Sequence, residues 1–510
     1  MPTKTKAKSL PDGQLDHHAI NEFKDVPIRA TIEENKKIME ELFKDSSDIV
    51  LREFDIENGP KAMLCYVDGM VTTSAVDDAL KALMILEGNA FSIDRITEQT
   101  LPVTQASKIQ FYKELLTNLL SGDSVLFVDE QDTAVCLGLR GGIRRSVSEP
   151  ETETVVRGPR EGFNEHLRTN TSLLRSKIKS PRLKLKSFVI GTETNTNVVL
   201  AYMAGIVNPK LLEEAEKRIS RIHIDGVLES GYIEEFIQDQ GYSPFPQVQT
   251  TERPDTVAAG LLEGRIAIMV DGTPFALLAP FGFWQWLQAS EDYYERFMAT
   301  TLLRWLRLGS LFVALLAPAI YIAVSTFHPE MIPTNLLLSI AASREAIPFP
   351  AVVEALIMEL SFEALREAGV RLPKIVGQAV SILGALVVGQ AAVQAGIVSA
   401  AMVIVVSMTG IASFTLPRYN AAIAIRMLRF PIMILASIFG LLGIIIGVMV
   451  VVGHLAKLTT FGIPYLAPVT PVDMSDMKDV MVRAPWWKMK KRPKYMGTSN
   501  VRRQRPEPEQ

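Results

Sequence analysis

The sequence is poor in the residues that build disulfide frameworks and metal sites. Its 510 residues include two cysteines and six histidines. Cys65 and Cys136 lie in apolar, strand-like segments, which predicts buried thiols in a reducing compartment rather than a disulfide framework. His17 and His18 are adjacent in a polar N-terminal stretch and the other histidines stand singly. A metal site needs more ligands at defined spacing, so we expect none.

Signatures of catalysis and nucleic-acid binding are equally scarce. The segment "GLRGGIRR" at 138–145 lacks the Gly-Lys-Ser/Thr ending of a phosphate-binding loop. Neither cysteine has a nearby histidine or cysteine that would indicate a nucleophile or a redox pair. The formal net charge of −3 gives no basic footprint for nucleic acid. We therefore expect neither an enzyme nor a cofactor nor a nucleic-acid partner.

Charged residues become scarce after residue 300. The runs Leu308–Phe327, Ile375–Pro417 and Phe430–Gly453 contain no Lys, Arg, Asp or Glu. A membrane span needs roughly 20 apolar residues, so the middle run is long enough for two. These runs predict an all-α, multi-pass membrane domain over 300–456, with a C-terminal tail at 457–510.

Basic clusters orient these spans. Arginines and lysines precede the first run and flank the middle one, so all clusters lie on one side if 351–368 also crosses the membrane. That gives about five segments. The first residues lack the apolar core of a signal peptide, so we expect the first ~300 residues to be cytoplasmic. Five spans would leave the tail outside, whereas "WWKMKKRPKY" at 486–495 is typical of a cytoplasmic interface, and the side of the tail stays open.

The first 290 residues have a mixed α/β pattern. We expect a flexible lead-in over 1–46, an α/β subdomain over 47–145, a charged linker over 146–159 and a second α/β subdomain over 160–290. Within the first subdomain, hydrophobic periodicity predicts strands at 48–56, 61–69, 124–129 and 133–139, and helices at 76–86 and 107–120.

Two landmarks indicate that the second subdomain repeats the first. "YVDGMV" at 66–71 is echoed by "YMAGIV" at 202–207, and "GDSVLFVD" at 122–129 by "GRIAIMVD" at 264–271. The second copies lie 136 and 142 residues further along, so the spacing is nearly constant. We interpret this as two copies of one α/β unit and expect the same strand order in both.

One segment between the apolar runs is rich in carboxylates. "AVVEALIMELSFEALREAG" at 351–369 places Glu359, Glu363 and Glu367 on one helical face, which Val352 and Leu356 continue. Glu354 lies nearly opposite. Carboxylates at membrane depth usually face a bundle interior or a water path. The helix could therefore line a pore in a symmetric ring, or lie on the membrane interface with its carboxylates in water.

Several ordered motifs resemble the GerA family, the A subunits of spore germinant receptors. They are "SPFPQVQTTERPD" (243–255), "EGRIAIMVDGTPFAL" (263–277), "SEDYYERF" (290–297), "FHPEMIP" (327–333), "SREAIPFP" (343–350) and "EALREAGVRLPK" (363–374). With "GPREGFNEHLRTNTSLLRSKI" upstream, the resemblance covers about 160–485.

The resemblance implies a protein of the spore inner membrane that triggers germination. It would work with a permease-like B subunit and a lipoprotein C subunit, respond to a nutrient, and release monovalent cations. Similar A subunits are expected to form homo-oligomers, with pentamers favoured, that act as nutrient-gated cation channels. A related branch that accompanies dipicolinate-release proteins shares most motifs, so a transporter or scaffold subunit without conductance is the alternative.

With this resemblance we favour the pore interpretation. Val352 and Leu356 are predicted to form an apolar constriction and Glu359 and Glu363 a ring that attracts cations, with Glu367 also lining the pore. The prolines of "SPFPQVQTTERPD" predict an ordered, non-helical connection. We expect Arg253, Asp255 and Arg344 to be candidates for contacts between subunits.

Overall fold

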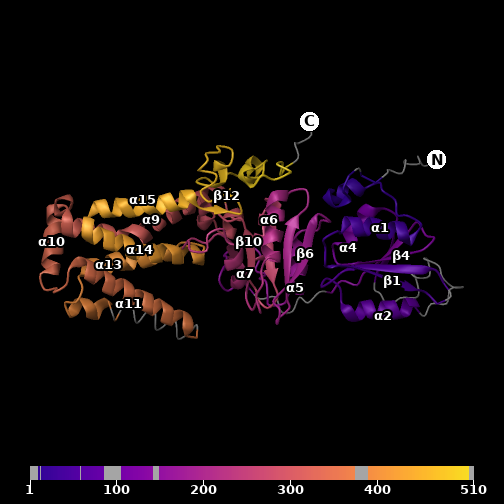
Figure 1. The fold of residues 1–510 in the computed structure, drawn as a ribbon, viewed down its shortest axis with the longest axis horizontal. Helices are drawn as coiled ribbons and strands as arrows, with labels where there is room; N and C mark the ends of the chain where they lie inside the picture. The colour runs from indigo at the N-terminus through magenta and orange to yellow at the C-terminus, as the bar shows by residue number, and fades with distance from the viewer. Residues whose placement is uncertain are drawn as a thin grey trace.

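The computed structural model describes residues 10–504 apart from 12, 58, 85–104, 142–148, 374–386 and 388. The molecule is elongated, with two α/β units and a helical domain arranged along one axis (Figure 1). The second α/β unit lies between the first and the helical domain. The C-terminal tail returns to this middle unit.

The first α/β unit is an antiparallel five-stranded sheet with helices on both faces. Its strands lie in the order β1-β2-β4-β5-β3. One hydrophobic core packs α1 and α4 against one face, and a second packs α2 against the other. The elements are α1 (Ile32–Leu42), β1 (Ile49–Asp55), β2 (Lys61–Val67), α2 (Thr73–Met84), β3 (Ala106–Ile109), α4 (Tyr112–Leu119), β4 (Ser124–Val128) and β5 (Ala134–Leu137).

The second α/β unit has the same topology. Its strands lie in the order β6-β7-β9-β10-β8, which is the order of the first sheet element by element. The elements are α5 (Leu167–Lys177), β6 (Leu183–Ile190), β7 (Thr196–Met203), α6 (Pro209–Ser220), α7 (Ser230–Ile237), β8 (Gln249–Thr251), α8 (Pro254–Leu262), β9 (Ile266–Val270) and β10 (Ala276–Ala279). The expected similarity of the two subdomains is therefore confirmed.

The repeated landmarks are turns that require glycine. Gly69 follows β2 and Gly205 follows β7, with φ of +81° and +70°. Gly122 precedes β4 and Gly264 precedes β9, with φ of +101° and +93°. Glycine adopts these left-handed conformations without the steric cost that other residues have. The sequence echo therefore reflects equivalent backbone turns in the two units.

Two predictions about the first unit are wrong. The expected flexible lead-in contains α1, whose Met39 and Leu42 are fully buried against the sheet. α1 contains the charged stretch "EENKK", but its residues 32, 35, 38, 39 and 42 are buried and lie on one face of the helix. The helix expected over 107–120 also begins later, because 106–109 pair with β5 as an edge strand. Its alternating polar residues fit a strand as well as a helix.

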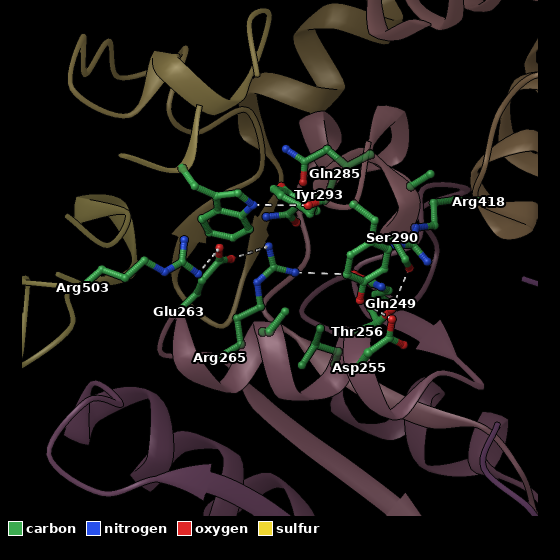
Figure 2. Close-up of a pocket in the computed structure, with 17 residues that line it drawn as sticks. Gln249, Asp255, Thr256, Glu263, Arg265, Gln285, Ser290, Tyr293, Arg418 and Arg503 are labelled. Carbon is green, nitrogen blue, oxygen red and sulfur yellow. Dashed lines mark hydrogen bonds and ion pairs between the residues drawn. The ribbon is translucent and has the colours of Figure 1, made fainter. Parts of the chain in front are cut away.

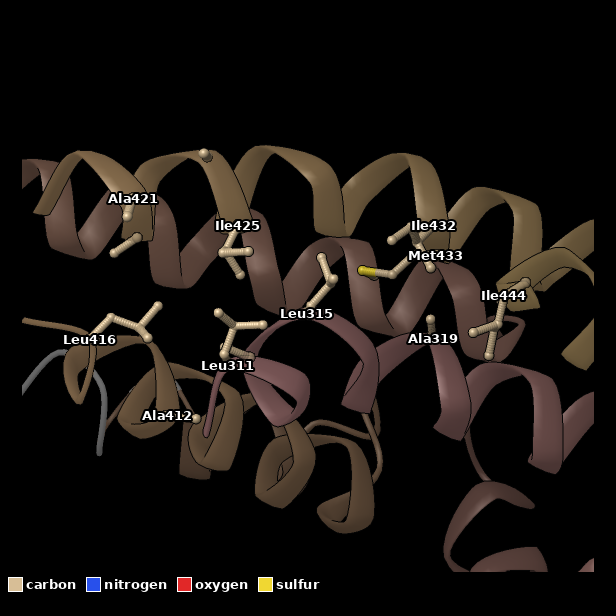
Figure 3. Packing of buried hydrophobic residues seen from close by; sticks show 14 of the residues in the cluster. Leu311, Leu315, Ala319, Ala412, Leu416, Ala421, Ile425, Ile432, Met433 and Ile444 are labelled. Atoms are coloured by element: carbon tan, nitrogen blue, oxygen red, sulfur yellow. The ribbon is translucent and has the colours of Figure 1, made fainter. Parts of the chain in front are cut away.

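The C-terminal half is a helical domain with a small-residue core. Figure 3 shows Leu311, Leu315 and Ala319 of α9 packed against Ile425 and Met433 of α14. The described helices are α9 (Phe297–Phe327), α10 (Thr334–Arg344), α11 (Ala351–Arg371), α13 (Ala400–Phe414), α14 (Tyr419–Phe439) and α15 (Leu441–Lys457). Of these, α9 and α14 are long and apolar enough to cross a membrane, and α13 and α15 are shorter apolar helices.

The last apolar run is a helical hairpin, and our expectation of one span there is wrong. The chain turns back at Gly440, whose φ is +60°, so 430–453 is shared between α14 and α15. Arg426 and Arg429 belong to the basic cluster that follows the middle apolar run, and such charges usually mark the end of a span. Both arginines are instead buried inside α14.

The tail lies at the same end of the helical domain as the α/β units. Its short elements are β11 (Thr459–Thr460), β12 (Ile463–Pro464), η8 (Met477–Asp479), η9 (Trp486–Lys488) and η10 (Lys494–Met496). The backbone N–H of Ser499 donates to Ile206 O at 3.1 Å, and Arg503 pairs with Glu263 at 3.1 Å. These contacts attach the tail to the second α/β unit.

Candidate functional site

The carboxylate-rich segment is the 21-residue helix α11, which begins after Pro350. Proline just before the first turn fits this position because early helical N–H groups have no intrahelical acceptor. α11 packs on α13 and α9 and runs back toward the α/β units, where Val370 lines a cavity together with Glu229, the N-cap residue of α7. Each of its four glutamates contacts an arginine.

Glu354 connects α11 to α10 and to the start of α13. Its side chain is fully buried, and one oxygen lies 3.3 Å from Arg344 Nε of α10. The other oxygen accepts from the backbone N–H of Ser399 at 2.9 Å. Ser399 is the N-cap of α13, and its hydroxyl accepts from Met402 N at 3.2 Å. A carboxylate is stabilised at a helix N-terminus by the unpaired N–H groups and the helix dipole.

Glu359 lies in the middle of the domain. It forms an ion pair with Arg429 of α14, and both side chains are almost fully buried. Arg429 also donates from Nε to Ala314 O of α9 at 2.8 Å. This pair therefore connects three helices. Breaking a buried pair by removing one partner is strongly destabilising, because it leaves an uncompensated charge.

Glu363 is more exposed and has two arginine neighbours. Arg366 lies 3.3 Å away on the same helix, and Arg426 of α14 approaches at 3.2 Å. Arg366 also donates to Ser413 Oγ of α13 at 3.2 Å and stacks 4.8 Å from the Phe414 ring centroid. The carboxylate keeps 43% of its side chain accessible, so it can still meet water or an ion.

Glu367 completes the stripe at the end near the α/β units. It pairs with Arg371 at 2.6 Å, and 64% of its side chain is exposed. Val352 and Leu356, at the other end of the stripe, are partly buried against the helical core. The stripe therefore changes from buried to exposed along α11. The assignment of these five residues to a pore lining stays a prediction.

Sequence reasoning missed most of the arginine partners. From the sequence, Arg366 is a neighbour of the glutamates on the same helix, whereas Arg426 and Arg429 belong to the basic cluster that follows the middle apolar run. The spacing held a signal, since Glu359 and Glu363 are four residues apart and Arg426 and Arg429 are three apart, so each pair lies on one helical face. Matching the two faces would have indicated adjacent helices.

The candidate contact residues have partners within the chain. Arg253 is fully buried and donates to Asp255 Oδ2 at 2.8 Å and to Pro159 O at 2.8 Å. The non-helical connection expected over 243–255 is observed over 243–253, and its last two residues, Pro254 and Asp255, begin α8. Arg344 pairs with Glu354 as described above. A further role of Arg253, Asp255 and Arg344 between subunits stays a prediction.

A second buried network joins the helical domain to the tail. Asp292 is almost fully buried and accepts from Arg304 Nε at 3.2 Å and from Arg307 at 2.8 Å. Arg304 also donates to Asp479 of the tail at 3.0 Å, and Tyr293 donates to the same carboxylate at 2.9 Å. The first turns of α9 are thus held from both sides by buried charges.

The two cysteines are buried and unpaired, as expected. Burial raises the pKa of Cys136 to about 12, so this thiol is not poised as a nucleophile. In the described part of the chain, no three His, Cys, Asp or Glu side chains gather as a metal site would require.

The chain matches the sequence profile of the Bacillus/Clostridium GerA spore germination protein family over residues 37–495. The protein belongs to the GerA family. The motif resemblance is therefore confirmed, and it extends further than the motifs indicated, because the match begins in α1 and includes the first α/β unit.

Relatives of this GerA protein cover nearly its whole length. The Bacillus subtilis (strain 168) membrane protein YfkQ, described as uncharacterized, is 55% identical over 476 residues, 93% of each chain. Spore germination protein KA of the same organism is 47% identical over 472 residues, 91% of this chain and 87% of the relative. Spore germination protein GerLA of Bacillus cereus is 41% identical over 415 residues, 81% of this chain and 84% of the relative.

A solved structure also matches. The N-terminal domain of the A subunit of the Bacillus megaterium spore germinant receptor GerK3 is 38% identical, with a TM-score of 0.39. The match covers 50% of this chain and 97% of the solved domain. The family and its relatives assign this GerA protein a role in spore germination.

Proposed function

We propose that this chain is the A subunit of a spore germinant receptor and forms an oligomeric, nutrient-gated cation channel. Family membership supports the receptor role. The observation that carries the channel role is the stripe of α11, in which carboxylates change from buried to exposed along one helix. In a homo-oligomer, with pentamers favoured, five such helices around an axis would give apolar rings at Val352 and Leu356 and acidic rings at Glu363 and Glu367.

The distribution of side chains supports a membrane position for the helical domain. Large apolar side chains face outward on α9, α13, α14 and α15, including Phe312, Ile411, Ile438 and Met449, each more than half exposed. Arg429 and Glu359 face inward. Soluble monomers rarely expose apolar patches of this size, whereas a lipid-facing surface is apolar. We infer a multi-pass protein of the spore inner membrane, with its α/β units and tail in the cytoplasm.

The pairing of Glu359 with Arg429 fits a closed conformation. Neutralised by the arginine, this carboxylate is held away from the ion path, while Glu363 and Glu367 remain accessible. Widening at Val352 and Leu356 would admit water, because apolar rings gate by dewetting. Monovalent cations would then pass. The proposed partners are the permease-like B subunit and the lipoprotein C subunit of the receptor.

The same pairing also favours a second candidate. In a scaffold subunit without conductance, every glutamate of α11 would serve packing, as Glu354 and Glu359 do here. The dipicolinate-associated branch of the family is the setting in which we would expect this.

Cation release from spores distinguishes these two functions. Spores carrying Val352→Ala or Leu356→Ala are expected to leak potassium before any nutrient is added, since a smaller side chain widens the constriction. Ile357→Ala shortens a residue that is partly buried like Val352 and Leu356 but lies about 100° around the helix from Leu356, and it is the matched control. If both variants hold potassium as wild-type spores do and germinate normally, the channel proposal loses its support, and the scaffold is favoured.

A further inference from the structure

A pocket of about 140 Å³ lies where the second α/β unit, the connector to α9 and the tail meet. Figure 2 shows Arg265 pointing into its middle, with Glu263 and Arg503 on one side and Ser290 and Gln249 on the other. Arg265 follows the Gly264 turn at the start of β9. This cavity plays no part in the proposed ion path.

Arg265 is buried without a close acid. Only 5% of the residue is exposed, and its Nε has no hydrogen-bond partner. Its closest ion pair with a described residue is to Glu263, at 3.9 Å. Ion pairs with good geometry have N–O distances of roughly 2.7–2.9 Å. A buried guanidinium without such a partner is costly unless something else compensates it.

The other charged side chains that line the pocket are already paired. Glu263 is contacted by Arg503 at 3.1 Å, and Asp255 by Arg253 at 2.8 Å. Arg418 forms an ion pair with Glu153 of the linker. Among the described lining residues, Arg265 is therefore the positive charge that remains without a close partner.

Gln249 does not supply the missing acceptor. Its amide oxygen lies 3.5 Å from Arg265 Nη1, at the limit of a hydrogen bond. In the orientation that satisfies both ends of the amide, the oxygen accepts from Arg418 at 3.1 and 3.2 Å. The NH₂ group then takes the place next to Arg265, and a donor cannot compensate a guanidinium.

We propose that this pocket binds a small organic carboxylate whose carboxylate group pairs with Arg265. A guanidinium binds a carboxylate through two parallel N–H···O bonds. Leu278, Ala259 and the indole of Trp486 provide an apolar wall for the rest of the molecule, and the hydroxyls of Ser290 and Thr256 can hold a polar substituent. Pockets for small molecules typically combine apolar walls with a few polar groups.

Binding would fasten the tail to the second α/β unit. Trp486 donates to Tyr293 O at 3.2 Å, and Arg503 stacks on its indole at 5.3 Å, so both tail residues close the pocket over the connector to α9. A bound carboxylate would add contacts among these three parts of the chain. The inference does not depend on ion conduction.

Binding of benzoate and benzamide to the full-length protein in detergent tests the site. The two probes have similar shape, but only benzoate carries a carboxylate. We expect benzoate to bind at least about tenfold more tightly, a difference of about 1.4 kcal/mol, because only it can form the ion pair. Arg265→Gln should abolish this preference, and Arg265→Lys should retain part of it. Arg160→Gln, which changes an exposed arginine, should have no effect.

Two further readouts separate a binding site from a structural residue. Arg265→Gln should unfold at no lower temperature than wild type, because the charge that it removes has no close partner. Benzoate should also slow tryptic cleavage at Lys488 in wild type but not in Arg265→Gln. The proposal is overturned if benzoate fails to bind at millimolar concentration, if Arg265→Gln binds it as wild type does, or if inorganic phosphate binds equally well.

Discussion

Glu359 of α11 and Arg429 of α14 form an ion pair in the interior of the helical domain, and Arg429 also reaches the backbone of α9. The pair joins a helix that we propose to line an ion path to two helices that are long and apolar enough to cross a membrane. Removing either partner should therefore lower the free energy of unfolding, whether or not it changes ion conduction.

Glu359→Gln is expected to lower the free energy of unfolding by about 3–5 kcal/mol, because Arg429 would keep a buried charge without its partner. Thermal unfolding in detergent measures the change. Glu367→Gln removes an exposed pair and should cost at most about 1 kcal/mol. Replacing Glu359 and Arg429 together by leucine should recover much of the loss. Equal unfolding temperatures for Glu359→Gln and Glu367→Gln would show that the buried pair is not formed.

Gly440 sets the hairpin between α14 and α15. Its φ of +60° and ψ of −138° lie in a region open almost solely to glycine, and an added Cβ would lie 3.1 Å from atoms of Phe327 and His328. Gly440→Ala should cost roughly 1–3 kcal/mol. Gly453 lies inside α15, and an added Cβ would meet no atom within 4 Å, so Gly453→Ala should be neutral or slightly stabilising. Unfolding temperatures that rank the two variants the other way would contradict the hairpin.

The α/β region contains a carboxyl group that should make stability depend on pH. Burial, with a smaller contribution from Glu229, raises the pKa of Glu234 to about 7. Between its unfolded value of 4.5 and 7, the folded state binds more protons than the unfolded state, so the contribution of Glu234 to stability falls as pH rises. Glu234→Gln should therefore be more stable than wild type at pH 8 and equally stable near pH 4.5.

Urea unfolding of wild type and variant at these two pH values gives the comparison. Glu235→Gln changes the exposed neighbour and should show no such pH dependence. A stability difference between wild type and Glu234→Gln that stays constant with pH would mean that Glu234 is solvated and ionised in the folded protein.

Asp292 should control docking of the tail. Asp292→Asn leaves Arg304 and Arg307 without their shared carboxylate, which should cost about 3–5 kcal/mol locally. Because Arg304 also holds Asp479, the tail should become more accessible, and trypsin should cleave at Lys488 faster. Glu295→Gln changes a half-exposed acid nearby and should leave cleavage unchanged. Equal cleavage rates in wild type, Asp292→Asn and Glu295→Gln would show that the Asp292 network does not hold the tail in place.

The sequence predicted the parts of the fold whose patterns are local or repeated. The two sheets followed from alternating apolar residues and from the turn glycines Gly69 and Gly205, which need positive φ in both units. The charge-free runs indicated where α9, α13, α14 and α15 lie, whereas most of the first of the two spans expected in 375–417 falls outside the described residues. α1 was missed because its buried stripe is interrupted by surface charges, so composition resembled a flexible segment.

The predictions that the structure contradicts concern contacts between segments that are distant in the sequence. Arg426 and Arg429 have the pattern of flanking charges, and only a comparison of their spacing with that of Glu359 and Glu363, on a distant segment, indicates that the two helices are adjacent. The turn at Gly440 was hidden in an uninterrupted apolar run. The shared helical face of Glu359, Glu363 and Glu367 could be predicted from their spacing, whereas the pairing of Glu359 with the buried Arg429 depends on the packing of three helices.

The most direct test of the account is the conductance of the purified protein in planar bilayers, with its oligomeric mass measured in the same preparation. The account predicts a homo-oligomer with cation-selective conductance that Val352→Ala or Leu356→Ala increases and that loses selectivity in Glu363→Gln with Glu367→Gln. A monomer, or an oligomer whose conductance and selectivity are the same in wild type and all these variants, would contradict the assignment of α11 to the ion path.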